Sequence, residues 1–90
     1  MALMSVTWSE AADDAKAIGM AERLFADIEA DSKKKGLYNK FKYLNYAAPT
    51  QDVIGGYGEA SAAKLRAVSK KYDPTGLFQK AVPGGYKLFA

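Results

Sequence analysis

The sequence predicts an α+β fold in which strand, helix, strand and helix follow one another and end in a docked C-terminal tail. Three observations predict it: an apolar, β-branched stretch at residues 2–8, a second alternating stretch at residues 41–46, and apolar residues at spacings of three and four over residues 9–35 and 59–72. The strands would form a small, incomplete sheet covered by the two helices. With 90 residues, the chain is expected to be a single segment, residues 1–90.

The composition excludes several classes of site. The chain has no Cys and no His, which excludes a disulfide framework, a Cys/His zinc site and a Ser–His–Asp triad. These absences leave a carboxylate-only Mg²⁺ or Ca²⁺ site open, but no metal site is predicted. A net charge of +3 is too small to indicate a nucleic-acid partner. No apolar run is long enough to span a membrane, and the N-terminus lacks the basic region of a signal peptide. We expect a soluble chain without a membrane partner, cytoplasmic if Met1 is the native start.

The first strand should cover residues 2–8 and end on Trp8, because this stretch mixes apolar and β-branched side chains. A cap at Thr7 or Ser9 would then begin a helix that runs to about Lys35.

The long helix of residues 9–35 is predicted by its apolar stripe: Ala11, Ala15, Ile18, Ala21, Leu24, Phe25, Ile28 and Ser32. Acidic residues in its first turns and the lysines of residues 33–35 in its last turn suit the helix dipole, and Gly36 is a natural left-handed terminator. Such a helix is roughly 40 Å long. That length favours a larger sheet or a partner.

The second strand, residues 41–46, should place Phe41, Tyr43 and Asn45 on one face, with Lys42, Leu44 and Tyr46 on the other. A loop with paired glycines leads from it to the helix of residues 59–72, which should bury Ala62, Leu65, Val68 and Tyr72 and end before Pro74. The tail is too apolar for a free end. We expect it to bury Leu77, Phe78, Leu88 and Phe89.

Three patterns allow a functional and a structural interpretation. The lysines of residues 33–42 could bind phosphate or nucleic acid, but a solvated helix end is favoured. Residues 55–58 precede a helix, as a phosphate cradle would, yet they match no phosphate-binding motif and favour a flexible turn. Asp27 and Asp31 are helix neighbours on a polar face, where a solvated surface is the better interpretation.

The stretch Tyr43-Leu-Asn-Tyr46 places a phenol beside an amide, which could line a site for a polar ring or sugar. A tyrosine with an ordinary pKa of about 10 acts as a general base only in surroundings that favour its phenolate. Tyrosines in strands more often serve as amphipathic packing residues.

Several motifs in order resemble the berberine-bridge-enzyme-like (BBE) segment at the C-terminus of FAD-linked oxidoreductases of the vanillyl-alcohol-oxidase superfamily. They are Tyr43-Leu-Asn-Tyr46, Tyr57-Gly58, Lys64-Leu65, Lys70-Lys-Tyr-Asp-Pro74 and Leu77-Phe78. The ending, residues 78–89, is most similar to fungal members. The likeness covers residues 40–89 well and residues 2–36 more loosely.

The resemblance implies that Tyr43 and Tyr46 are candidates for a catalytic base or a substrate contact in a complete enzyme, and Asn45 for a contact at the flavin edge. It leaves the choice between the two tyrosines open. The family's FAD is held by a separate flavin domain, so this chain alone is expected to bind no FAD and to be no enzyme. The expected partner is the missing FAD domain or a second copy in a homodimer. The alternative function is a stand-alone dimerising or ligand-binding protein without redox activity.

The homodimer is expected on physical grounds as well. Two strands leave unpaired edges and the apolar stripe of the long helix uncovered. Two copies could pair by extending the sheet or by packing their helices of residues 9–35 together.

Overall fold

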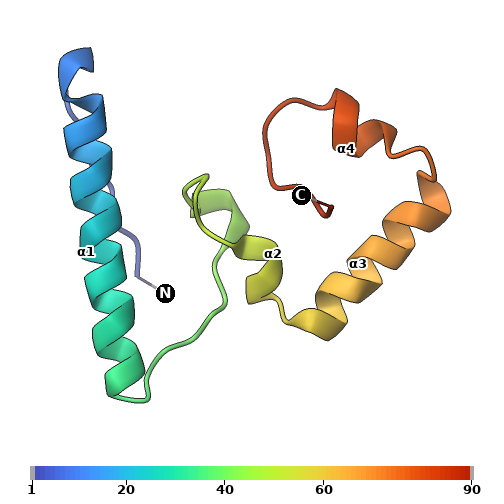
Figure 1. Ribbon diagram of the computed structural model, residues 1–90, viewed down its shortest axis with the longest axis horizontal. Helices are drawn as coiled ribbons and strands as arrows, with labels where there is room; N and C mark the ends of the chain where they lie inside the picture. The colour runs from blue at the N-terminus through green and yellow to red at the C-terminus, as the bar shows by residue number, and fades with distance from the viewer. Residues whose placement is uncertain (1, 90) are drawn as a thin grey trace. The chain divides into compact units, whose positions relative to one another are not determined.

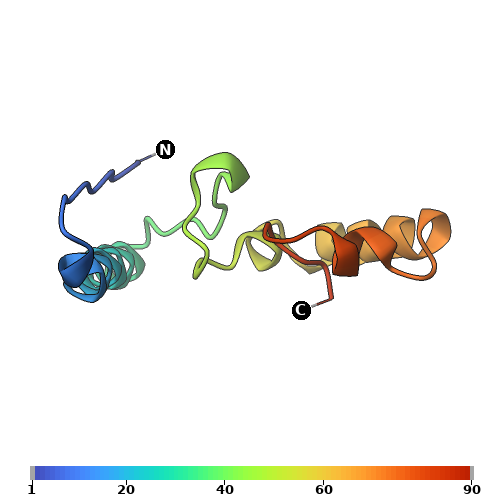
Figure 2. The same cartoon turned by 90° about the horizontal axis from the view of Figure 1, so that it is seen from above.

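The computed structural model describes residues 2–89, which fall into two compact units, one ending at Asn39 and one beginning at Lys40. The first holds a 3₁₀ turn, η1 (Ala11–Asp13), and helix α1 (Asp14–Lys34). The second holds the 3₁₀ turn η2 (Leu44–Tyr46) and helices α2 (Val53–Gly56), α3 (Glu59–Tyr72) and α4 (Leu77–Ala81) (Figures 1 and 2). No strand occurs within residues 2–89. The predicted α+β fold with a sheet is therefore wrong, and the described chain is helical.

The long helix is confirmed, with η1 and α1 together spanning Ala11 to Lys34. Its end is a Schellman motif: Leu37 N donates to Ser32 O at 2.9 Å and Gly36 N to Lys33 O at 3.2 Å. Gly36 has a φ of 68°, the left-handed conformation that its place after the helix predicted.

The predicted cap at Thr7 or Ser9 is wrong, because the helix begins two residues later than expected, at Ala11. No side chain caps either η1 or α1. Instead the Trp8 indole Nε1 donates to the Asp14 carboxylate at 2.6 Å, which holds the incoming chain against the first turn of α1.

The predicted strand at residues 2–8 is an extended trace without a ladder (Figure 2). Met4 and Val6 are half-buried whereas Leu3, Ser5 and Thr7 are exposed, so the alternation that suggested a strand is present. A strand also needs a second backbone for its hydrogen bonds. Alternation is a local property and pairing is not, which is why the sequence pattern misled here.

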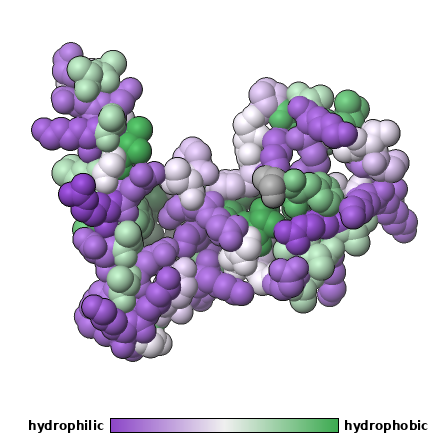
Figure 3. All heavy atoms as spheres, in the orientation of Figure 1, coloured by the Kyte–Doolittle hydropathy of each residue, from purple (hydrophilic) through white to green (hydrophobic). Residues whose placement is uncertain are grey.

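Most of the apolar stripe on α1 is uncovered. Ala17 is the only residue of the helix classed as buried, and Ile28 remains 50% exposed, with Ile18 and Leu24 similar. Figure 3 shows hydrophobic residues, in green, at the surface along this helix. Across residues 2–89, no helix combines the length and the hydrophobicity needed to cross a bilayer.

The predicted strand at residues 41–46 is also wrong. Residues 44–46 form a 3₁₀ turn, in which Tyr46 N donates to Tyr43 O at 3.1 Å. Since no neighbouring strand accepts these amides, local i→i+3 hydrogen bonds satisfy them instead. Without these strands, the sheet-extension route to a homodimer is lost as well.

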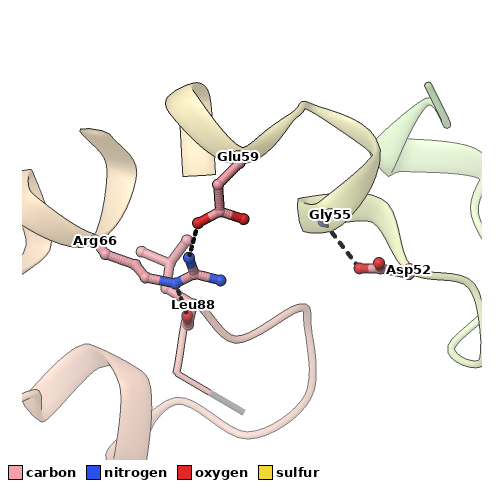
Figure 4. A network of polar contacts seen from close by, with 5 residues as sticks. All are labelled: Asp52, Gly55, Glu59, Arg66 and Leu88. Carbon is pink, nitrogen blue, oxygen red and sulfur yellow. Dashed lines mark hydrogen bonds and ion pairs between the residues drawn. The ribbon is translucent and has the colours of Figure 1, made fainter. Parts of the chain in front are cut away.

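The second unit has a small core. Val53 is 0% exposed and Ala62 1%, and Gly56 is buried beside them. A Cβ atom at Gly56 would lie 2.6 Å from the carbonyl oxygen of Lys40, so only glycine lets the two backbones approach so closely. The Asp52 carboxylate starts α2 by accepting from Gly55 N at 2.9 Å (Figure 4).

Helix α3 has the predicted bounds of residues 59–72. It buries Ala62 as expected, but Leu65, Val68 and Tyr72 are exposed. The predicted stripe of α3 is therefore covered at one position only.

The tail docks on its own unit through polar contacts. Arg66 Nε donates to Leu88 O at 2.9 Å (Figure 4). Leu88 N in turn donates to the Gln79 side chain at 2.9 Å. The predicted burial of its large apolar side chains is wrong: Phe78 is 67% exposed, Leu77 and Phe89 are also exposed, and Leu88 is half-buried. Fifty residues cannot surround every apolar side chain of so small a unit.

Candidate functional site

The three candidate residues of the YLNY stretch lie together on the η2 turn. The rings of Tyr43 and Tyr46 meet edge-on, with centroids 5.1 Å apart and planes at 80°. Asn45 Nδ2 donates to the Tyr43 hydroxyl oxygen at 3.1 Å. A 3₁₀ turn has three residues per turn, so side chains three apart are eclipsed and the two tyrosines meet. On the predicted strand they would have faced opposite ways.

This cluster of Tyr43, Asn45 and Tyr46 is a surface feature. Tyr46 is 60% exposed, and the other two are classed as exposed. The Tyr43 oxygen accepts from Asn45, so its O–H can donate to a ligand, and Tyr46 adds a second phenol. The turn therefore offers two aromatic faces and several hydrogen-bonding groups to a polar ring.

Contacts on the C-terminal side of η2 hold the turn in place. Ala48 O accepts from the Tyr86 hydroxyl at 2.5 Å, a bond between residues 38 positions apart. Ala48 N donates to the Gln51 side chain at 3.0 Å. On the N-terminal side, the rings of Phe41 and Tyr57 lie 5.8 Å apart at 38°.

Sequence reasoning did not identify Tyr86 as a support of the cluster. Its position between a glycine pair and an apolar ending indicated only that the tail docks. The partner, a backbone carbonyl, leaves no signature in a sequence.

The glycines before α3 serve packing. Gly55 N is bonded to the Asp52 carboxylate, and Gly56 is pressed against the backbone at Lys40. Gly58 has a φ of 89° at the N-cap of α3. Gly56 N donates to Asp52 O at 3.3 Å and Gly58 N to Gly55 O at 3.1 Å, so the amides of this stretch are used within the turn itself, which supports its interpretation as a turn.

The charged patterns of α1 are also structural. Lys35 pairs with Asp31 at 2.7 Å, and Lys33 Nζ lies 4.6 Å from the centre of the Tyr38 ring. These contacts support a solvated helix end. Among the described residues, no three acidic side chains gather as a metal site would require.

Comparison with known proteins relates the chain to part of larger fungal enzymes. No family model matches the chain, and no solved structure matches it. It is 44% identical over 81 residues to the FAD-dependent monooxygenase FUP4 of Fusarium proliferatum, covering 90% of this chain and 16% of that protein. It is 42% identical over 86 residues to the bifunctional solanapyrone synthase of Alternaria solani, covering 96% of this chain and 17% of the synthase.

A third relative carries a different name. The oligopeptidase PhomG' of Diaporthe leptostromiformis is 41% identical over 90 residues, but the match covers only 7% of it. The chain spans about one sixth of the length of the first two relatives. It therefore corresponds to a segment of larger FAD-type oxidoreductases of fungi.

Proposed function

We propose that the chain is the C-terminal BBE-like segment of an FAD-linked oxidoreductase of the vanillyl-alcohol-oxidase superfamily and is not catalytic on its own. The exposed cluster of Tyr43, Asn45 and Tyr46 carries this proposal, because it presents two phenols and an amide to a partner surface. The relatives support it, since this chain matches one sixth of proteins several times its length.

In the complete enzyme, Tyr43 and Tyr46 would contact the substrate, one of them as a base, and Asn45 would contact the flavin edge. These residues suit the edge of a polar ring, being exposed donors and acceptors on a supported turn. The glycine loop before α3 is less suited to bind the FAD pyrophosphate, because the Gly55 amide already donates to the Asp52 carboxylate. FAD would supply the electron acceptor, and the rest of the enzyme its phosphate contacts.

The open apolar surfaces are consistent with such a role. Ile18, Leu24 and Ile28 on α1, and Leu77 and Phe78 on α4, all remain exposed. A soluble protein seldom leaves so many large apolar side chains in water. The remainder of the oxidoreductase would cover them.

A chimera tests the proposal. In the Alternaria solani solanapyrone synthase, this chain replaces the matched segment, and both bound flavin and solanapyrone formation are measured. We expect the chimera to retain flavin. Tyr43→Phe or Tyr46→Phe should lower product formation at least tenfold while flavin stays bound, since a lost proton-transfer group typically costs about 10²–10⁴-fold.

Tyr72→Phe is the matched control, because Tyr72 is an exposed tyrosine on α3 outside the cluster. Equal losses in the control and the cluster variants would show that the cluster has no special role. A chimera that folds and holds flavin but tolerates both cluster substitutions would overturn the site assignment.

The second candidate is a stand-alone dimer, which the uncovered stripe of α1 favours. Two copies of α1 would pack their stripes together and bury more than about 1,000 Å². Light scattering of the purified chain at micromolar concentration decides: a dimer supports this candidate and a monomer excludes it. Ile28→Glu should dissociate such a dimer, whereas Glu22→Gln on the same helix should not.

A further inference from the structure

A hollow of about 410 Å³ lies in the second unit, lined by residues of the C-terminal end of α3, the turn into α4, and the returning tail. Its lining includes three lysines, one carboxylate and one aromatic ring: Lys70, Lys80, Lys87, Asp73 and Phe89. No part of the η2 cluster lines it. The volume is within the usual range for small-molecule sites.

The lysines are held in place around the hollow. Lys80 Nζ donates to Thr75 O at 2.8 Å, and Lys87 Nζ donates to Val82 O at 2.7 Å. Lys70 Nζ lies 5.7 Å from the centre of the Phe89 ring. An ammonium group has three donors, so one bond to a carbonyl leaves Lys80 and Lys87 two donors each for a ligand.

The single carboxylate is engaged with backbone amides. Asp73 accepts from Leu77 N at 2.9 Å and from Phe78 N at 3.0 Å, and so starts α4. Its charge is thus partly offset where it lies. With three lysines against one aspartate, the lining has a net charge of +2.

We propose that this hollow binds an aromatic phosphate monoester. The phosphate would lie among the lysine ammonium groups, and the aromatic group against Phe89, whose side chain is about half exposed. Nucleoside monophosphates and simple aryl phosphates share this chemistry. The hollow has room for either beside its phosphate contacts.

The test titrates the 90-residue chain with AMP, with phenyl phosphate and with adenosine, and follows the backbone amide resonances of Gly76 and Leu88 by NMR. We expect both phosphates to shift these resonances and adenosine to leave them unchanged. If AMP binds more tightly than phenyl phosphate, the ligand is a nucleoside monophosphate. The reverse order indicates a simple aryl phosphate. Raising NaCl from about 20 to about 200 mM should weaken binding, because exposed charges are screened.

The double variant Lys80→Gln, Lys87→Gln should weaken phosphate binding about tenfold, as the loss of two exposed charge pairs implies. The matched control, Lys16→Gln, Lys34→Gln, removes the same charge from α1 and should leave binding unchanged. Circular dichroism confirms that each variant keeps its helices, and Lys87→Gln alone serves if the double variant does not fold. Equal binding of adenosine and AMP, equal losses in both double variants, or no shift by either phosphate would overturn the proposal.

Discussion

The unit that holds α1 and the unit that begins at Lys40 are stabilised in different ways. Helix α1 starts and ends through contacts close in sequence, and Ala17 is its only buried residue. The second unit buries Val53, Gly56 and Ala62, and its hydrogen bonds join residues 22 and 38 positions apart.

The two units differ in whether local or long-range contacts hold their structure. The first has a well-formed helix whose large apolar side chains are mostly exposed, so its secondary structure rests on local hydrogen bonds. The second has an internal arrangement set by a close backbone approach and by tail contacts. Substitutions should therefore affect the two units by different mechanisms.

The largest effect is expected from Gly56→Ala. Its Cβ would meet the Lys40 carbonyl oxygen at 2.6 Å, so the backbone must shift at a cost of about 1–3 kcal/mol. Amide hydrogen exchange of α3 measures the loss residue by residue, with α1 as the internal reference. Unchanged protection of α3 would show that this close approach does not hold the second unit together.

The second largest effect is expected from removing a hydrogen bond that holds the tail. Arg66→Met keeps the aliphatic stem but removes the donor to Leu88 O, which should lower the free energy of unfolding by about 1 kcal/mol. Urea denaturation followed by circular dichroism measures it. Lys64→Met is the control, because its side chain is on the same helix and exposed. Equal losses in both would mean that the tail contact contributes nothing.

In the first unit, one substitution should stabilise the fold rather than destabilise it. Nothing lies within 4 Å of a Cβ added at Gly19, so Gly19→Ala should stabilise α1 by about 0.5–1 kcal/mol through helix propensity. The helical signal at 222 nm is expected to persist to higher temperature. A destabilised helix would indicate that Gly19 faces a partner surface, which would contradict a purely local account of α1.

The smallest effect is expected at Trp8. Trp8→Phe removes the indole donor to Asp14 and, because this bond is exposed, should cost only about 0.5 kcal/mol, confined to the first turns of α1. Amide exchange at residues 14–17 reports it. Protection lost along the whole helix instead would mean that residues 2–8 support α1 beyond this one bond.

The two long helices could be predicted from the sequence, whereas the strands could not and the short helices α2 and α4 were missed in the expected loop and tail. The stripes and termination signals placed α3, and η1 together with α1, within about two residues, because helical hydrogen bonds join neighbours in the chain. Residues 2–8 and 41–46 have strand-like composition, but a strand exists only beside another backbone. The composition of a segment does not show whether a second strand lies beside it.

The candidate site shows the same division. The left-handed Gly36 and the bounds of α3 were determined by the sequence alone, since each depends on residue type and short spacing, whereas Tyr43, Asn45 and Tyr46 were chosen as candidates because of a family resemblance and remain a prediction. Only the tertiary structure decided that the three side chains gather on a 3₁₀ turn and that Tyr86 supports it from 38 positions away. It also decided that the tail docks through hydrogen bonds and leaves its apolar side chains exposed. The long-range contacts of Arg66 and Tyr86 each join a side chain to a distant backbone carbonyl, a group that every residue carries, so no residue pattern encodes the partner.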